Sequence, residues 1–245
     1  MTADSAAPRA AIVTGGSSGI GLAIARMLGE EGYGLTIAAR RPDKLEAAAR
    51  ELAAAGHDVE HVAGNLGDEA VVRQVVEAHR ERDGRLDVLV NNAGIGIGAP
   101  VAEIATKRLD LQLDVNLRST ILFYRDAVEM LRAAGAEHGN AVVVNTASIA
   151  GKSGQAWMSV YSATKAGVIG FTEAMNKELG ADGVKSCALC PAFVDTPMAD
   201  WVKGSIPAQD MIQPQDVAEG VRMLLRLSPA CIVPELVFER RGEGI

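Results

Sequence analysis

The chain is 245 residues long, 48% of its residues are hydrophobic, and its formal net charge at pH 7 is −7. A chain of this length can bury one large hydrophobic core, so we expect a single domain that spans residues 1–245. The negative charge and the absence of a block of Lys and Arg argue against nucleic acid and anionic membranes as partners.

Short runs rich in β-branched residues alternate with longer segments whose apolar residues recur three and four positions apart. Strands are predicted, in chain order, at Ala10–Thr14, Leu35–Ala39, Val59–Ala63, Val88–Val90, Ala141–Thr146, Ser186–Leu189 and Ile232–Phe238. Helices are predicted between them at Gly19–Glu31, Asp43–Ala55, Glu69–Arg82, Thr106–Ala134, Val160–Leu179 and Pro214–Leu227. This alternation indicates a Rossmann-like, doubly wound parallel α/β sheet of about seven strands, with helices on both faces.

The segment 192–213 has the least regular pattern in the chain and contains Pro197 and Pro207. Loops of this length in compact domains usually cover or bind a ligand, so we predict a substrate lid here. In a doubly wound sheet, ligands bind outside the carboxyl ends of the strands, near the point where the strand order reverses. The site should therefore be built from the segments that directly follow the strands.

Three further features argue against an exported protein or a metalloprotein. Residues 1–11 include Asp4 and lack the apolar core of a signal peptide, and no later stretch resembles a membrane span, so we expect a cytoplasmic protein. Cys187 and Cys190 form a C-x-x-C pattern, but within a buried strand they would point to opposite faces and could not share a disulfide or a metal. The four histidines are scattered, so we expect no metal site.

A glycine-rich turn joins the first predicted strand to the next helix through Thr14-Gly15-Gly16-Ser17-Ser18-Gly19-Ile20-Gly21. Glycines here let the backbone approach a pyrophosphate at the positive end of a helix dipole. A tight turn that needs positive φ values would also use glycine. The spacing G-x-x-x-G-x-G differs from the commoner G-x-G-x-x-G dinucleotide motif.

Other motifs follow in a fixed order along the chain. Asn91-Asn92-Ala93-Gly94 follows the fourth predicted strand, and Asn116 lies inside the next helix. Ser148 follows the fifth strand, and Tyr161-Ser162-Ala163-Thr164-Lys165 begins 13 positions later. Together with the glycine turn, this ordered set resembles the short-chain dehydrogenase/reductase family of the classical type. The resemblance covers about residues 10–200 and implies an oxidoreductase in which Asn116, Ser148, Tyr161 and Lys165 are catalytic.

The residue types suit proton transfer beside a hydride acceptor. Tyr161 and Lys165 are four positions apart on a predicted helix, so both side chains lie on one face. A tyrosine with a pKa of about 10 needs a pKa lowered by roughly three units to act near neutrality, and a cation at about 4 Å supplies roughly that. We therefore expect Lys165 to lower the pKa of Tyr161, and Ser148 to donate a hydrogen bond to the substrate oxygen. Without the other motifs, a Tyr and a Lys four positions apart on a helix more often have a structural role, in which the aliphatic part of the lysine packs over the tyrosine ring.

The resemblance also implies which residues contact the cofactor. Asn65 stands where the family usually has an aspartate, and Ala192 replaces the glycine of the family's Pro-Gly segment after Pro191. The implied cofactor-binding residues are Gly15, Ser17, Ser18, Gly19, Ile20, Gly21, Arg40, Arg41, Asn65, Leu66, Asn92, Ala93, Gly94, Tyr161, Lys165, Pro191, Val194 and Thr196.

The end of the second predicted strand favours NADP(H) over NAD(H), although NAD(H) remains possible. NAD-specific relatives carry an acidic residue there, whereas this chain has Ala39 followed by Arg40-Arg41. A guanidinium binds a phosphate through charge-assisted hydrogen bonds. The two arginines could instead be a solvent-exposed pair at the start of the next helix, without a role in binding.

The expected substrate is a small, mostly apolar ketone or secondary alcohol, because the segments expected to face it are apolar. These residues are Ile95, Ile97, Gln155, Ala156, Trp157, Met158, Phe193, Met198, Trp201 and Met211. Two alternatives stay open: a regulatory nucleotide-binding protein without turnover, and an epimerase or dehydratase that uses the same residues.

We also expect the chain to bind copies of itself, as a homotetramer or a dimer. The family usually packs its two long helices, here Thr106–Ala134 and Val160–Leu179, against symmetry mates. Apolar residues on these helices could form the interface or face the sheet: Leu113, Leu117, Ile121, Phe171 and Met175.

Overall fold

The computed structural model describes residues 8–242, so both ends of the expected 1–245 domain lie outside the described residues. Seven strands form one sheet in the order β3-β2-β1-β4-β5-β6-β7, and all neighbouring strands are parallel. The strands are β1 Ala10–Thr14, β2 Gly34–Ala39, β3 Val59–Ala63, β4 Val88–Asn91, β5 Ala141–Thr146, β6 Val184–Pro191 and β7 Glu235–Phe238. The predicted doubly wound parallel fold is confirmed.

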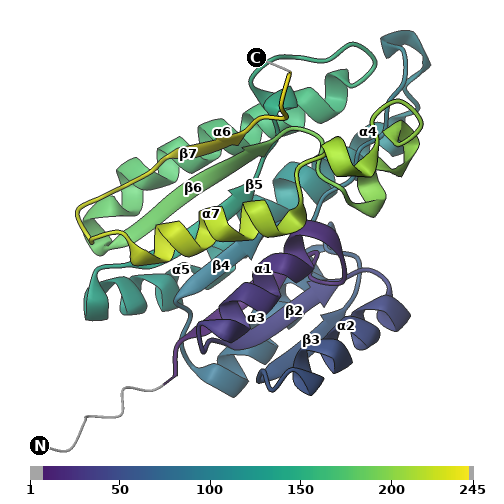
Figure 1. Cartoon of the computed structure of the whole chain (residues 1–245). Helices are drawn as coiled ribbons and strands as arrows, with labels where there is room; N and C mark the ends of the chain where they lie inside the picture. Colours follow the sequence, from purple (N-terminus) through teal and green to yellow (C-terminus); the bar gives the residue numbers. More distant parts are fainter. Residues whose placement is uncertain (1–7, 243–245) are drawn as a thin grey trace, which may run out of the picture.

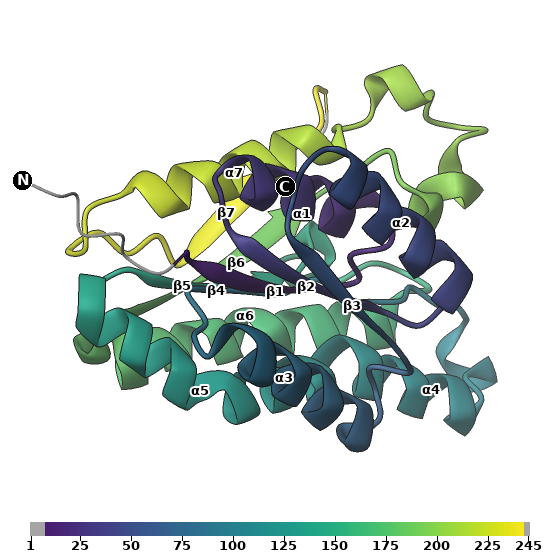
Figure 2. The same ribbon diagram turned by 90° about the horizontal axis from the view of Figure 1, so that it is seen from below.

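Helices cover both faces of the sheet (Figure 1). Figure 2 shows α1, α2 and α7 on one face, and α3, α5 and α6 on the other. The helices are α1 Gly19–Glu30, α2 Pro42–Ala54, α3 Glu69–Asp83, α4 Thr106–Leu113, α5 Ser119–His138, α6 Ser159–Leu179 and α7 Pro214–Arg226. Among the described residues, no helix combines the length and hydrophobicity that a membrane span requires.

The hydrophobic core is divided by the sheet into two layers. On β1, Val13 packs on the α1 and α7 side, whereas its neighbour Ile12 packs on the α3 and α5 side. The same alternation separates Cys187 from Cys190 on β6, which confirms that the two thiols point to opposite faces. Both cysteines are free, and burial raises the pKa of each thiol to about 12.

Two predicted elements differ from the observed ones by more than two residues at one end. The long helix predicted at Thr106–Ala134 is divided by a π-helical segment, Asp114–Arg118, and continues to His138, where Gly139 takes a left-handed conformation. The last strand, predicted from Ile232, begins at Glu235. Pro234 has no N–H to donate to a strand ladder, which explains why regular pairing starts after it.

The strand order reverses between β1 and β4, because β2 and β3 lie on one side of β1 and the later strands lie on the other. The carboxyl ends of β1, β4, β5 and β6 therefore meet at one edge of the sheet. The loops that follow these four strands carry most of the motifs identified in the sequence.

Candidate active site

The glycine turn after β1 is packed too closely to accept side chains. A Cβ at Gly15 would lie 2.8 Å from Asn92 Nδ2, and one at Gly21 would lie 2.4 Å from the carbonyl oxygen of Gly15. Gly15 and Gly19 also have φ values of 68° and 55°, which a residue with a Cβ rarely adopts. The turn thus exposes backbone directly before α1, as a phosphate cradle at a helix N-terminus requires.

Arg40 and Arg41 follow β2 directly and are both exposed. Neither forms an ion pair with another described residue, so their guanidinium groups are available to an anion. Asn65, after β3, is exposed and accepts a hydrogen bond from the Gly67 N–H at 3.3 Å, while the neighbouring Leu66 is buried.

Asn92 joins the carboxyl ends of three strands. Its N–H donates to Thr14 Oγ1 at 2.9 Å, and its side-chain Nδ2 donates to the Thr14 carbonyl oxygen at 3.2 Å. Its Oδ1 accepts from Thr146 Oγ1 on β5 at 3.2 Å, and the Ala93 N–H also donates to Thr14 Oγ1, at 3.0 Å. Asn92 and Ala93 thus fix the loop that leads to Gly94.

Ser148, Tyr161 and Lys165 come together at the ends of β5 and α6. Lys165 Nζ donates to the Thr146 carbonyl oxygen at 2.6 Å and lies 5.6 Å from the centroid of the Tyr161 ring. Ser148 lies at the N-cap of the turn Ile149–Gly151, where its Oγ accepts from the Ala150 N–H at 3.2 Å.

Burial dominates the electrostatics of this group. It lowers the pKa of Lys165 to about 8. It raises the pKa of Tyr161, and a hydrogen bond with Ser148, which lowers the pKa, does not outweigh it. This is opposite to the lowered Tyr161 pKa expected from the sequence. The reason is that removal from water disfavours tyrosinate more than the neighbouring groups stabilise it.

Asn116 lies in the π-helical segment between α4 and α5 and is 1% exposed. Its Oδ1 accepts from the Ile95 N–H at 2.8 Å, and its Nδ2 donates to the Ile95 carbonyl oxygen at 2.9 Å and to Thr164 Oγ1 at 3.2 Å. Gly94 is adjacent, since a Cβ there would lie 3.5 Å from both Asn116 Oδ1 and Lys165 Nζ. Single-turn π segments often occur at functional sites.

The segment 192–213 has more structure than a simple loop. Val194 is 5% exposed and bridges to Ile212, and Thr196 packs against the glycine turn, because a Cβ at Gly19 would lie 2.8 Å from Thr196 Cγ2. Pro191, the last residue of β6, is buried and its carbonyl oxygen accepts from Ser148 Oγ at 3.4 Å. The segment also encloses a small hydrophobic core of its own, formed by Ala199, Val202, Ile206 and Met211.

Four of the ten predicted substrate-facing residues differ clearly in their exposure. Met211 is 5% exposed inside the small core just described, so its predicted place in the substrate lining is wrong. Trp157, Met198 and Trp201 are instead exposed, on the loops that follow β5 and β6. Trp157 also has a positive φ, of 67°. Among the described residues other than glycine, no other residue has a positive φ.

Sequence reasoning missed several residues that hold the site together. Thr14 and Thr146 orient Asn92, and Thr164 bonds to Asn116. Gln112, 1% exposed, accepts a hydrogen bond from the Ile97 N–H at 3.1 Å. A polar residue one turn before Asn116, on the same helical face, was the available sequence signal for Gln112.

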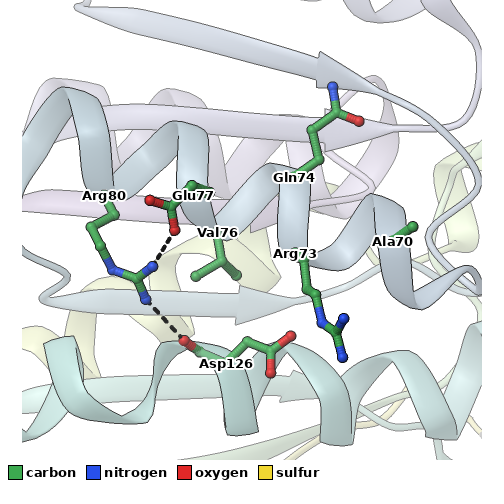
Figure 3. Close-up of a pocket in the computed structure, with 7 residues that line it drawn as sticks. All are labelled: Ala70, Arg73, Gln74, Val76, Glu77, Arg80 and Asp126. Carbon is green, nitrogen blue, oxygen red and sulfur yellow. Dashed lines mark hydrogen bonds and ion pairs between the residues drawn. The ribbon is translucent and has the colours of Figure 1, made fainter.

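A separate surface groove of about 500 Å³ lies between α3 and α5 (Figure 3). Arg80 crosses it, paired with Glu77 and donating to the Asp126 carbonyl oxygen at 3.3 Å. None of the motif residues lines this groove, so it is not part of the candidate active site. Within residues 8–242, no three His, Cys, Asp or Glu side chains gather as metal ligands.

Comparisons with known proteins agree on one family. The sequence profile described as "short chain dehydrogenase" matches residues 9–204. A putative ketoacyl reductase of Streptomyces coelicolor is 36% identical over 254 residues, covering 96% of both chains. The granaticin polyketide synthase putative ketoacyl reductase 1 of Streptomyces violaceoruber is 40% identical over 205 residues, covering 82% of this chain and 74% of the relative.

Solved structures show the same fold. A variant of the actinorhodin polyketide ketoreductase with NADPH has a TM-score of 0.85 and 34% identity, and covers 94% of this chain and 95% of its own. An alcohol dehydrogenase from the archaeon Thermococcus sibiricus, complexed with 5-hydroxy-NADP, has a TM-score of 0.87 and 28% identity, and covers 97% and 98% of the two chains.

Proposed function

The chain belongs to the short-chain dehydrogenase family, and we propose that it transfers a hydride between NADP(H) and a ketone or secondary alcohol, with Tyr161 as the general acid and base. One observation carries the proposal: Ser148, Tyr161 and Lys165 meet at the sheet edge where the glycine turn opens. The proposed direction near neutral pH is reduction of the ketone.

The residues present fit a phosphorylated dinucleotide. The cradle formed by Gly15, Gly19 and Gly21 has no room for a Cβ, and it leads into the N-terminus of α1. Arg40 and Arg41 are exposed where a 2′-phosphate would be bound, and they offer charge-assisted hydrogen bonds. When bound, NADPH supplies the hydride; the remaining steps fall to side chains of this chain.

The pKa directions suit reduction. Because the Tyr161 pKa is raised, its hydroxyl stays protonated at pH 7 and can give its proton to the carbonyl oxygen of the substrate. Lys165, with a pKa of about 8, is still mostly charged at that pH and stabilises the tyrosinate that forms. Ser148 donates a hydrogen bond to the same substrate oxygen. Alcohol oxidation needs tyrosinate at the start, so it should increase as the pH rises.

The proposed substrate class is a ketone attached to an apolar group or an acyl chain. Two relatives are named as ketoacyl reductases, which supports an acyl ketone. The exposed side chains of Trp157, Met198 and Trp201, on the loops after β5 and β6, support an apolar substrate.

The test is an assay of NADPH oxidation with a panel of cyclic ketones and an acetoacetyl thioester. The loss of NADPH absorbance measures the reduction of each ketone. Tyr161→Phe should lower kcat at least about 100-fold and leave the Kd for NADPH within about twofold, because it removes the proton and keeps the ring. Tyr124→Phe is the matched control, since Tyr124 is buried against Ser186 in the core. Activity of Tyr161→Phe within tenfold of the parent would contradict the assigned role.

A further inference from the structure

The loop after β4 passes directly beside Tyr161. A Cβ at Gly96 would lie 3.9 Å from Cδ2 and Cε2 of the Tyr161 ring and 3.4 Å from Met158 Cε. A Cβ at Gly98 would lie 3.2 Å from Met158 Sδ. The loop backbone therefore lies against the ring of the proposed acid and against Met158. With two glycines in three residues, it has little conformational preference of its own.

Three hydrogen-bonded anchors hold this loop, at every second residue. Asn116 binds both the N–H and the carbonyl oxygen of Ile95. Gln112 Oε1 accepts from the Ile97 N–H at 3.1 Å, and the Trp157 carbonyl oxygen accepts from the Ala99 N–H at 2.8 Å. The first anchor lies nearest β4, and the third lies at the far end of the loop.

Gln112 is the anchor for the middle of the loop. The outer anchor is the backbone carbonyl of Trp157. This residue has a left-handed backbone conformation, which tryptophan rarely adopts, and it is 73% exposed. Gln112 is 1% exposed on α4. A buried amide is costly unless it is hydrogen-bonded, so a glutamine at this position is explained by its bond to the loop.

We propose that Gln112 is a positioning residue that fixes the Ile95–Ala99 loop and so sets the width of the substrate space beside Tyr161. This inference rests on the proposed ketone reductase function. Its consequence depends on substrate size: a ketone that fills the space is bound less well when the loop moves, whereas a small ketone is affected little.

The test compares two variants of nearly equal side-chain length. Gln112→Met removes the acceptor and keeps the packing volume, whereas Gln112→Glu keeps an oxygen that can accept from the Ile97 N–H. Gln112→Met should raise the KM for the bicyclic 2-tetralone roughly tenfold and the KM for cyclohexanone less than about twofold, with the Kd for NADPH unchanged. Gln112→Glu should return the 2-tetralone KM to within about threefold of the parent. Gln74→Met, at an exposed position of α3, is the matched control.

Hydrogen–deuterium exchange of the Ile95–Ala99 amides gives a readout that needs no turnover. Exchange should be faster in Gln112→Met and near the parent rate in Gln112→Glu. Equal KM changes for both ketones, failure of Gln112→Glu to restore the KM, or unchanged exchange would each overturn the inference. A parent that reduces no ketone contradicts the proposed function instead, and the exchange rates then decide whether Gln112 holds the loop.

Discussion

At the scale of single residues, Arg40 offers the sharpest test of cofactor choice. Ala39 ends β2, and the exposed Arg40 follows it without an ion-pair partner among the described residues. We predict that the parent prefers NADPH, and that Ala39→Asp combined with Arg40→Leu shifts the ratio of kcat/KM toward NADH by about 100-fold. The physical reason is that the new carboxylate repels a 2′-phosphate and accepts hydrogen bonds from the ribose hydroxyls instead.

The measurement is kcat/KM with both cofactors for parent and variant. Arg50→Leu is the matched control, because Arg50 is an exposed arginine of α2 whose one ion pair among residues 8–242 is with Glu46. A parent that already favours NADH, or a ratio that the double substitution leaves unchanged, would show that Arg40 does not bind the phosphate.

The meeting of Ser148, Tyr161 and Lys165 could be predicted from the sequence, because strand and helix periodicity place them at the same edge of the sheet. Tyr161 and Lys165 share one helical face by periodicity alone, and Ser148 follows a recognisable strand. The direction of the Tyr161 pKa was not predictable, because burial by groups distant in the chain decides it. The helical spacing from Asn116 could have singled out Gln112, but not its bond to Ile97, because nothing local indicates that the loop returns to α4.

At the scale of secondary-structure elements, Asp87 lies just before β4 and connects this segment to β1 and to the end of α5. Its carboxylate accepts from the Ala10 N–H of β1 at 2.8 Å, from two nitrogens of Arg85 at 2.9 and 2.7 Å, and from His138 at the end of α5 at 2.9 Å. Burial alone would raise the pKa of Asp87, but these hydrogen bonds outweigh it and lower the pKa. Asp87 is 1% exposed, so it contributes as a buried, fully bonded charge.

We predict that Asp87→Asn lowers the free energy of unfolding at pH 7 by about 3 kcal/mol, because it leaves Arg85 without its buried partner. A lowered native pKa gives stability that is complete above the ordinary aspartate value of about 4 and is lost as the pH falls below it. The difference between parent and variant should therefore shrink as the pH falls below about 4.

Urea unfolding followed by circular dichroism measures the difference. Asp58→Asn is the control, because that carboxylate is 81% exposed in its pair with Arg82 and should matter little. An Asp87→Asn variant as stable as the parent at pH 7 would refute this account.

Element boundaries were predicted well where the hydrophobic period is strong and poorly where hydrogen bonding departs from it. The period that runs through Thr106–Ala134 does not change at residues 114–118, yet there the backbone becomes π-helical and Asn116 faces Ile95. That change in hydrogen bonding follows from tertiary contacts that periodicity does not encode.

At the scale of the whole molecule, two pairs of exposed apolar residues mark two separate faces. One face is α4 and α5, where Leu113 and Ile121 are each 39% exposed. The other is α7 and β7, where Met223 is 43% exposed and Val237 is 39% exposed. Phe171, in contrast, packs edge-on against Tyr124 and supports the core.

Two separate apolar faces predict a tetramer built from two kinds of two-fold contact. β7 strengthens this expectation, because it ends the sheet and pairs with β6 alone among the described strands, which leaves its other edge open. A symmetric contact through each face closes four chains into one assembly, whereas a contact through either face alone gives a dimer. Light scattering of the parent at micromolar concentration should therefore give a mass near four times 25.6 kDa.

A single charged substitution on each face tests the two contacts separately. Ile121→Glu and Val237→Glu should each yield a dimer, and the double variant a monomer, because a carboxylate buried in a symmetric contact meets its own copy. Far-UV circular dichroism checks that each variant is folded. A parent mass near 25.6 kDa would exclude self-association at that concentration, and a single variant that falls directly to monomer would show that one face alone holds the assembly together.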